Sequence, residues 1–293
     1  MDCVVALDVG GTTMKGGFVA QDGTILHFEQ RATPRAEGPG RVIAEISAFV
    51  SELSRPRAGL RPLAVGLAVP GLVTETHAVF SAAFGWRDVP ASAFTDVDLP
   101  VALGHDVRSA GEAELVYGGH SSGDVLFLPI GTGIAGAVVL SGSLYGGAGG
   151  WAGQIGHVPV WPDGLACGCG QRGCLAAYAS GGALAARCGV ASASEVARRV
   201  AEGDERAVQV WDEAVEALAA GLATYTLLLD PDTVVVGGGV SQAGDALLGP
   251  LRERLAARLT FRRPPELRAS VLGARAGVLG AGSLGWRAAS PAA

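Results

Sequence analysis

The sequence predicts a two-domain α/β protein built on an internal duplication. At 293 residues the chain is long enough to form two hydrophobic cores. One pattern, an apolar strand followed by a glycine-threonine loop and a second strand, occurs in residues 4–30 and again in residues 125–145. In both halves strands alternate with amphipathic helices, which is typical of α/β domains.

The first domain is expected to span residues 1–107. Its first segment is predicted to form a strand, a glycine-threonine loop, a second strand, an Asp22-Gly23 turn and a third strand. Strands are also predicted at 63–69 and 101–105. Before these two strands, a helix is predicted whose apolar residues share one face: Val42, Ile46, Phe49, Val50 and Leu53.

The second domain is expected to span residues 108–273. Strands are predicted at 125–130 and 134–140, on either side of a Gly131-Thr132-Gly133 loop, and at 233–236, which leads into Gly237-Gly238-Gly239. Helices are predicted at 176–188, 193–202, 204–229 and 241–259. A final helix of small residues, about 274–288, is expected to pack back on the first domain.

Composition excludes several classes of protein. A content of 49% hydrophobic and 17% charged residues indicates a soluble globular protein, and a net charge of -6 disfavours nucleic acid as a partner. The sequence shows neither an export signal nor a transmembrane helix, so we expect a cytoplasmic protein without a membrane partner. Five cysteines, an odd number in a reducing compartment, argue against a disulfide framework.

The glycine loops suggest phosphate binding. Residues 131–136 match the GxGxxG string of dinucleotide-binding proteins, but a strand follows where that fold needs a helix. A Walker A loop is excluded because Lys15 follows methionine rather than glycine. What remains is a pair of glycine-threonine hairpins that would cradle phosphate from two sides. For either loop alone, an ordinary hairpin turn is the alternative.

A metal site is predicted in residues 156–174, where one imidazole and three thiols lie close together in the sequence. A set of three thiolates and one imidazole suits a closed, four-coordinate and therefore structural zinc. Incidental buried thiols are the alternative interpretation. The predicted ligands are His157, Cys167, Cys169 and Cys174.

The chain resembles the ROK family of bacterial sugar kinases and repressors. The motifs that carry the resemblance are DVGGT at 8–12, LAVPGLV at 67–73, GTGIAGAVVLSGSLYGGAGGWAGQIGH at 131–157 and CGCGQRGC at 167–174. The resemblance implies a duplicated, actin-like (ribonuclease H-like) ATPase fold that binds ATP and sugar in a cleft between its domains. In this family the repressors carry a helix-turn-helix domain before the first glycine-threonine loop. Because that loop's motif begins here at Asp8, we expect no such domain, which favours the kinases of the family over the repressors.

The family's motifs also imply roles for particular residues. Asp106 matches the catalytic base, although an aspartate before a helix is more often an N-cap. Asp8 matches the carboxylate that holds hydrated magnesium, and Lys15 would neutralise phosphate charge or lie along a strand edge. The expected cofactors are ATP, catalytic Mg²⁺ and structural Zn²⁺. The remaining nucleotide-binding residues are expected to be Gly10, Gly11, Thr12, Thr13, Gly131, Thr132, Gly133, Gly237, Gly238 and Gly239.

The expected substrate pocket departs from the family's pattern. The resemblance implies asparagine or glutamate at four positions that contact glucose, and this chain carries Ala83, His105, Gln154 and Ala176 there. Loss of hydroxyl-binding groups shifts specificity by orders of magnitude, so we expect a hexose or hexose-like substrate altered near C1 and C2. Gly71, Asp106 and His157 complete the expected pocket.

Several alternatives stay open at this point. A kinase of C7-cyclitols, a glucokinase proper and a catalytically idle regulatory or binding protein of the same family each fit the sequence. A homodimer or homotetramer is expected by analogy with the family.

Overall fold

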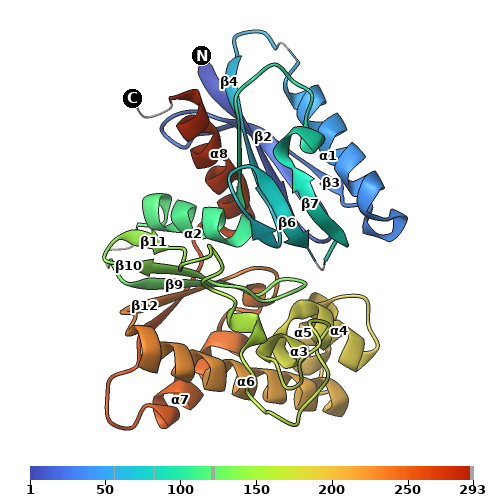
Figure 1. Ribbon diagram of the computed structural model, residues 1–293. Coiled ribbons are helices and arrows are strands. Elements are labelled where there is room, and N and C mark those ends of the chain that lie inside the picture. The colour runs from blue at the N-terminus through green and yellow to red at the C-terminus, as the bar shows by residue number, and fades with distance from the viewer. Residues whose placement is uncertain (56, 82, 120–122, 291–293) are drawn as a thin grey trace. The chain divides into compact units, whose positions relative to one another are not determined.

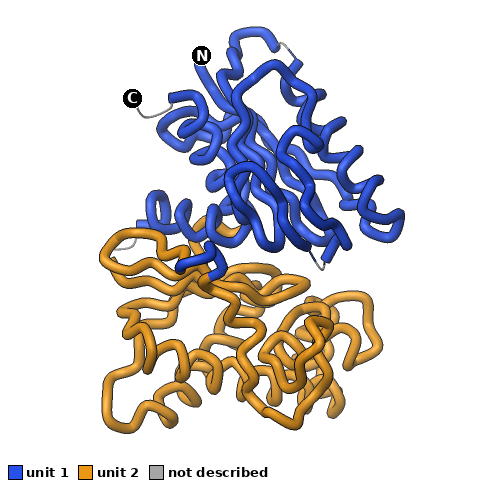
Figure 2. The backbone as a smooth tube through the Cα atoms, in the orientation of Figure 1, with its two compact units in different colours: residues 1–119, 148–151, 274–293 blue, residues 120–147, 152–273 orange. Residues whose placement is uncertain are grey.

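The computed structural model describes residues 1–55, 57–81, 83–119 and 123–290. The chain divides into two compact units (Figure 2). Unit 1 comprises Met1–Gly119, Ala148–Trp151 and Ala274–Ala293, and unit 2 comprises His120–Gly147 and Ala152–Gly273. The units thus separate at Gly119, whereas the domain ranges expected from the sequence separate at residue 107 and remain a prediction.

Each unit contains a five-stranded sheet of the same topology. The strand orders are β3-β2-β1-β4-β8 in unit 1 and β11-β10-β9-β12-β13 in unit 2. In both sheets the first three strands are antiparallel neighbours and the last two run parallel to the third. The predicted duplication therefore extends from one hairpin to a whole sheet. The strands are β1 Asp2–Val9, β2 Thr13–Val19, β3 Ile25–Ala32, β4 Arg61–Val69, β8 Val101–His105, β9 Val125–Pro129, β10 Ala137–Leu140, β11 Ser143–Tyr145, β12 Thr233–Gly237 and β13 Glu266–Ala269.

In unit 1 the central strand β1 is covered on both faces (Figure 1). Side chains alternate across a strand, so Cys3, Val5 and Leu7 share one face. This face packs in the hydrophobic core with α1 (Pro39–Leu53), which buries all five of its predicted apolar residues. The opposite face, which includes Val4 and Asp8, lies against the C-terminal helix α8 (Ala276–Ala289).

Helix α8 approaches the sheet closely because small residues form the contact. A Cβ atom placed on Gly66 of β4 would lie 1.8 Å from the carbonyl oxygen of Ala281. The same helix contacts α2 (Asp106–Tyr117), the helix that follows the last strand of the unit 1 sheet. The helix predicted near the C-terminus is present and belongs to unit 1.

In unit 2 the segment between β11 and β12 carries the cysteine-containing loop and four helices. The helix predicted over 176–188 is wrong as a single element, because Ser180 adopts extended backbone angles and caps a second helix through its hydroxyl. The predicted strand 134–140 starts only at Ala137, and the predicted helix 241–259 starts at Asp245 after a 3₁₀ turn. The helices are α3 Leu175–Ala179, α4 Gly181–Cys188, α5 Ala193–Ala201, α6 Glu205–Leu229 and α7 Asp245–Arg258.

Two features were not predicted from the sequence. A small antiparallel sheet of β5 (Leu72–Val73), β6 (His77–Ser81) and β7 (Trp86–Pro90) follows β4, and β13 forms the edge of the unit 2 sheet. The small sheet is anchored by Trp86, whose ring lies 4.7 Å from Phe84 and 5.4 Å from Phe94. Within the described residues, no helix is both long and apolar enough to cross a bilayer.

Candidate active site

Two acidic residues lie at the same edge of the unit 1 sheet. Asp8 is near the end of β1, and Asp106 is the first residue of α2, directly after β8. The strands β1, β4 and β8 are parallel neighbours, so their carboxyl ends meet at one edge, where open α/β sheets bind ligands. We call Asp8 and Asp106 the carboxylate pair.

Asp8 is a buried carboxylate, only 9% exposed. Its pKa is raised to about 7, mainly by burial; the ammonium of Lys15 opposes this rise, and the nearby Asp106 carboxylate contributes to it. Lys15 lies directly across the β1–β2 ladder, with its Nζ 4.0 Å from Asp8 Oδ2. A divalent cation at this carboxylate would offset the cost of burying its charge, so the donor set fits magnesium.

Asp106 is held at the strand-to-helix junction. Its Oδ1 accepts a hydrogen bond of 2.7 Å from the N–H of Val107. Burial raises its pKa to about 6, while the Val107 N–H and the Arg108 guanidinium lower it. The N-cap of α2 is His105 rather than Asp106, so Asp106 does not have the structural role that was its alternative.

His105 is neutral at physiological pH. Burial, together with the nearby cation of Arg108, lowers its pKa to about 4. Its Nδ1 accepts the backbone N–H of Arg108 at 3.3 Å, so in the neutral ring the proton is on Nε2. Although Nδ1 also lies 3.3 Å from Asp106 Oδ1, a neutral ring forms no ion pair there.

The first glycine-threonine loop, residues 10–13, joins β1 to β2. Gly10 donates its N–H to the carbonyl of Thr13, and the hydroxyl of Thr33 donates to the carbonyl of Gly10. Gly11 faces open space: a Cβ placed on it would meet nothing within 4 Å. Hydrogen bonds therefore fix the loop at Gly10, and the loop is accessible at Gly11.

In unit 2 three glycine-rich segments converge. Ile130 donates its N–H to Gly237 and accepts one from Val240, which joins the ends of β9 and β12. The first two N–H groups of α4, from Gly181 and Gly182, donate to the carbonyls of the 131–133 loop. We call these segments the glycine cradle; its members are Gly131, Thr132, Gly133, Gly181, Gly182, Gly237, Gly238 and Gly239.

The glycine cradle has room for a ligand. A Cβ on Gly131, Gly133 or Gly239 would meet nothing within 4 Å, and none of the three has a positive φ. Neither packing nor backbone geometry therefore requires glycine at these positions. A ligand that comes close to the backbone would require it, as phosphate does in a glycine-rich loop.

The four predicted metal ligands lie together, with their donor atoms within 4.8 Å of one another. The Sγ atoms of Cys169 and Cys174 are 3.8 Å apart, as are Cys167 Sγ and His157 Nδ1. A tetrahedral zinc with Zn–S bonds of about 2.3 Å places two sulfur ligands about 3.8 Å apart, so the residues fit this ion. We call this group the Cys/His cluster.

The protonation of the Cys/His cluster also favours a cation. Burial, together with the two neighbouring thiols, raises the pKa of Cys174 to about 12, so this thiol ionises near neutral pH only where a cation is bound. Burial lowers the pKa of His157, which keeps the imidazole neutral and able to ligate. Such a set holds a metal firmly and offers no open coordination position.

Short backbone contacts bend the chain around the Cys/His cluster. Cys167 and Gln171 are joined by an N–H to carbonyl hydrogen bond of 2.9 Å, which closes a tight knuckle between two ligands. Gly173 has φ +71°, and a Cβ on it would lie 1.5 Å from the carbonyl oxygen of Trp161. Only glycine fits there, and it allows Cys174 to turn back toward His157.

The residues expected to contact sugar lie in both units. In unit 1, Gly71 follows β4 with φ +114° and Ala83 lies in the turn between β6 and β7. In unit 2, Gln154 precedes the 3₁₀ turn that contains His157, and Ala176 is the second residue of α3. The Cys/His cluster therefore lies between Gln154 and Ala176 in the chain.

Two site features were missed in the sequence. The glycines that start α4 contact the 131–133 loop, and the Ser180-Gly181-Gly182 sequence, a capping residue before two glycines, was the available signal. The guanidinium of Arg108 donates to the carbonyl of Gly150 and so fixes the segment 148–151 to α2. No local pattern signals this contact, because it joins residues far apart in the sequence.

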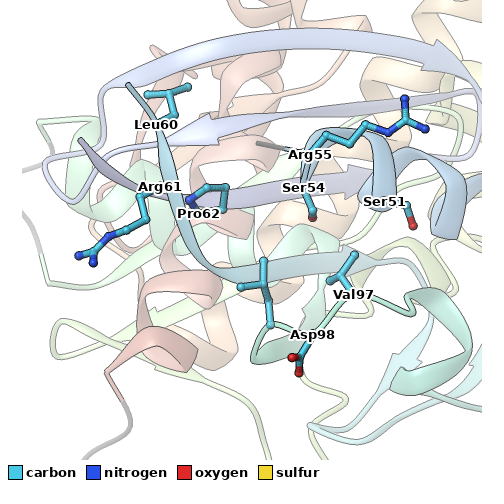
Figure 3. A pocket seen from close by; sticks show the side chains of 9 residues that line it. Ser51, Ser54, Arg55, Leu60, Arg61, Pro62, Val97 and Asp98 are labelled. Carbon is cyan, nitrogen blue, oxygen red and sulfur yellow. The ribbon is translucent and has the colours of Figure 1, made fainter. Parts of the chain in front are cut away.

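A depression of about 550 Å³ on unit 1 lies away from these groups (Figure 3). It is lined by the end of α1, including Ser54, and by Arg61 and Pro62 at the start of β4. Arg61 pairs with Asp2 across the β1–β4 ladder, six residues before Asp8, which places the depression about 20 Å from Asp8. It lies at the amino ends of the strands, opposite the carboxylate pair.

The duplicated sheet and its strand order define an actin-like ATPase fold. A crystal structure of a ROK family glucokinase from Streptomyces griseus, in complex with glucose and AMPPNP, matches with a TM-score of 0.87 at 30% identity, over 97% of this chain and 99% of that one. The glucokinase of Thermotoga maritima is 34% identical over 96% of both chains. An N-acetylmannosamine kinase of Yersinia pseudotuberculosis is 31% identical over 88% of both.

The sequence profile described as "ROK family" matches residues 4–287. The chain belongs to the ROK family. The predicted family, fold class and enzyme class, an ATP-dependent carbohydrate kinase, are thereby confirmed.

Proposed function

We propose that the protein transfers the γ-phosphoryl group of ATP to the primary hydroxyl of a hexose or hexose-like substrate, with Asp106 as general base. The observation that carries the proposal is the carboxylate pair, one buried and one half-buried acid at the carboxyl edge of one sheet, both with raised pKa values. Phosphoryl transfer depends mostly on positioning and charge neutralisation, and it needs one carboxylate that accepts the proton of the attacking hydroxyl.

Asp106 has the properties of such a base. With a pKa of about 6, about nine-tenths of its carboxyl groups are ionised at pH 7, and they are more basic than an exposed aspartate. Its hydrogen bond from Val107 is accepted by Oδ1, so Oδ2 would be the oxygen that accepts the proton of the hydroxyl. Sequence position and geometry thus favour the same residue.

Nucleotide binding is assigned to both units. In unit 1 the loop 10–13 would bind phosphate, and Asp8 would hold Mg²⁺ through its water ligands, with Lys15 beside it. In unit 2 the glycine cradle would lie along the remaining phosphates and the adenosine. When bound, the metal neutralises phosphate charge; Asp8 would hold the metal, and the ammonium of Lys15 would add a second positive charge.

The Cys/His cluster is assigned a structural zinc. It fixes the ends of the loop from which Gln154, His157 and Ala176 come, so it would position groups on the sugar side of the site. A closed set of three thiolates and one imidazole leaves the ion no position for substrate. Proton transfer is therefore assigned to Asp106 alone.

The substrate proposal rests on the altered pocket. Ala83 and Ala176 offer no side-chain hydrogen bond, and Gln154 carries no charge. The neutral ring of His105 presents its Nε2–H as a donor only, whereas an asparagine both donates and accepts. Together these groups would favour a hexose-like substrate altered on its C1 and C2 side. A C7-cyclitol phosphorylated on its primary hydroxyl fits this description, and glucose is the competing substrate.

A substrate panel tests the proposal. Hexoses, N-acetylhexosamines and C7-cyclitols are incubated with Mg·ATP, and ADP release is followed, with Asp106→Asn as the blank. We expect turnover of at least one acceptor that is lost in the blank. If glucose is the best substrate, the altered-pocket argument is wrong.

The alternative from another class is an idle binding protein that has kept the fold. A site that binds nucleotide stabilises the folded chain by RT ln(1 + [L]/Kd), about 2.7 kcal/mol at a hundredfold excess of ligand over Kd. A melting temperature that does not change with Mg·ATP would favour the idle protein.

A further inference from the structure

The C-terminal helix α8 lies directly against the carboxylate pair. A Cβ placed on Gly277, near the start of α8, would lie 2.1 Å from Asp8 Oδ2 and 2.3 Å from Asp8 Cγ. Such distances are impossible for real atoms. The absence of a side chain at position 277 is therefore what allows the Asp8 carboxylate its present position.

The helix itself cannot move away to relieve such a clash. Three residues on, a Cβ on Gly280 would lie 2.2 Å from the backbone carbonyl of Ser109 in α2. At the next residue, the carbonyl of Ala281 lies against Gly66 of β4. Both contacts are between backbones, so α8 is held in place just beyond Gly277. An added methyl group at 277 would displace the end of the Asp8 side chain rather than the helix.

Glycine at position 277 destabilises the helix, and the backbone of α8 does not need it. In a helix, glycine is less favourable than alanine. Gly277 lies in the first turn of α8 without a positive φ, so the backbone does not require it. Its requirement comes from Asp8.

We propose that Gly277 is a positioning residue for phosphoryl transfer: it leaves the space in which α8 holds the Asp8 carboxylate where Mg²⁺ and the nucleotide phosphates are bound. The inference rests on the role proposed above for Asp8. Lys15, 4.0 Å from Asp8 Oδ2, constrains the carboxylate from β2 and Gly277 bounds it from α8. The helix predicted only as a run of small residues thus acquires a functional role.

The test compares Gly277→Ala with Gly282→Ala. Both replace a glycine of α8, and a Cβ on Gly282 would lie 2.8 Å from Val19 Cγ1, so both meet a side chain at short distance. Only Gly277 faces the carboxylate pair. Asp8→Asn serves as the positive control.

The main readout needs no turnover: the rise in melting temperature caused by ADP, with and without Mg²⁺. For the wild type and Gly282→Ala we expect Mg²⁺ to enlarge the ADP-induced rise, and for Gly277→Ala and Asp8→Asn we expect this Mg²⁺-dependent part to disappear. In the kinase assay at limiting Mg²⁺, Gly277→Ala should lose about 10- to 100-fold in rate, since a misplacement of about 1 Å costs up to about 10²-fold. The ligand-free melting temperature of Gly277→Ala should equal that of the wild type or exceed it.

Three results would overturn the inference. Gly277→Ala with wild-type Mg²⁺ dependence would show that Asp8 keeps its position. Equal losses in Gly282→Ala would assign the effect to the packing of α8 in general. Asp8→Asn with wild-type Mg²⁺ dependence would remove the role of Asp8 itself. If no acceptor is turned over, the melting experiment still decides about Gly277, so failure of the proposed function is distinguishable.

Discussion

Replacing Asp106 with asparagine should make the protein more stable at pH 8 while removing its activity. Burial raises the pKa of this carboxyl from 3.8 to about 6. A difference of about 2 units corresponds to about 3 kcal/mol, by which the charged carboxylate destabilises the folded state. The side chain keeps 20% exposure, so this figure is an upper limit.

The direction of the stability change with pH follows from the number of protons that each state binds. Between pH 3.8 and about 6 the folded protein binds more protons at Asp106 than the unfolded chain, so this group's contribution to stability falls as pH rises through that window. Above pH 6 the full cost is present, and below pH 4 it is absent. Asp106→Asn should therefore raise the melting temperature at pH 8 and leave it nearly unchanged at pH 4.

The assay is thermal unfolding of both proteins at pH 4 and pH 8, with the exposed Asp98→Asn as control. We expect a gain of several degrees at pH 8, at roughly 2–4 °C per kcal/mol for a chain of this size. Turnover should fall by about 10²- to 10⁴-fold, the usual contribution of a general base. A melting temperature lowered equally at both pH values would refute the reasoning.

Three further outcomes are expected. Cys169→Ala should lose the bound zinc, detected by metal analysis, and melt lower, while a zinc-replete variant with unchanged stability would contradict the structural role. Gly133→Ala should raise the KM for ATP without changing the melting temperature, because nothing lies within 4 Å of the added methyl group; an unchanged KM would place the nucleotide elsewhere. In Arg108→Met, the fall of kcat at low pH should begin at a higher pH than in the wild type, because the Arg108 guanidinium lowers the pKa of Asp106. An unchanged dependence of kcat on pH would mean that a group other than Asp106 determines this fall.

Much of the site could be predicted because its residues follow local patterns. Asp8, the 10–13 loop and the 131–133 loop come directly after apolar strands, and the metal ligands lie within one short segment. Such features depend on sequence spacing, which is available without a structure. The same holds for α1, whose five apolar residues are buried as predicted.

The features that were missed depend on contacts between distant segments. The split of the predicted helix at Ser180 arises because the two glycines that follow it donate to the 131–133 loop, about fifty residues earlier. The approach of Gly277 to Asp8 joins the two ends of the chain. No periodicity or propensity indicates such contacts, so the contact of α8 with Asp8 could be found only from the fold.

The measurement that tests the central claim most directly is the amount of phosphate ester formed by the wild type and by Asp106→Asn on the best acceptor, followed by mass spectrometry at pH 7.5. The account predicts a monophosphate on the primary hydroxyl from the wild type, formed about 10²- to 10⁴-fold more slowly by the variant. Equal rates of formation would contradict the assignment of Asp106 as the base.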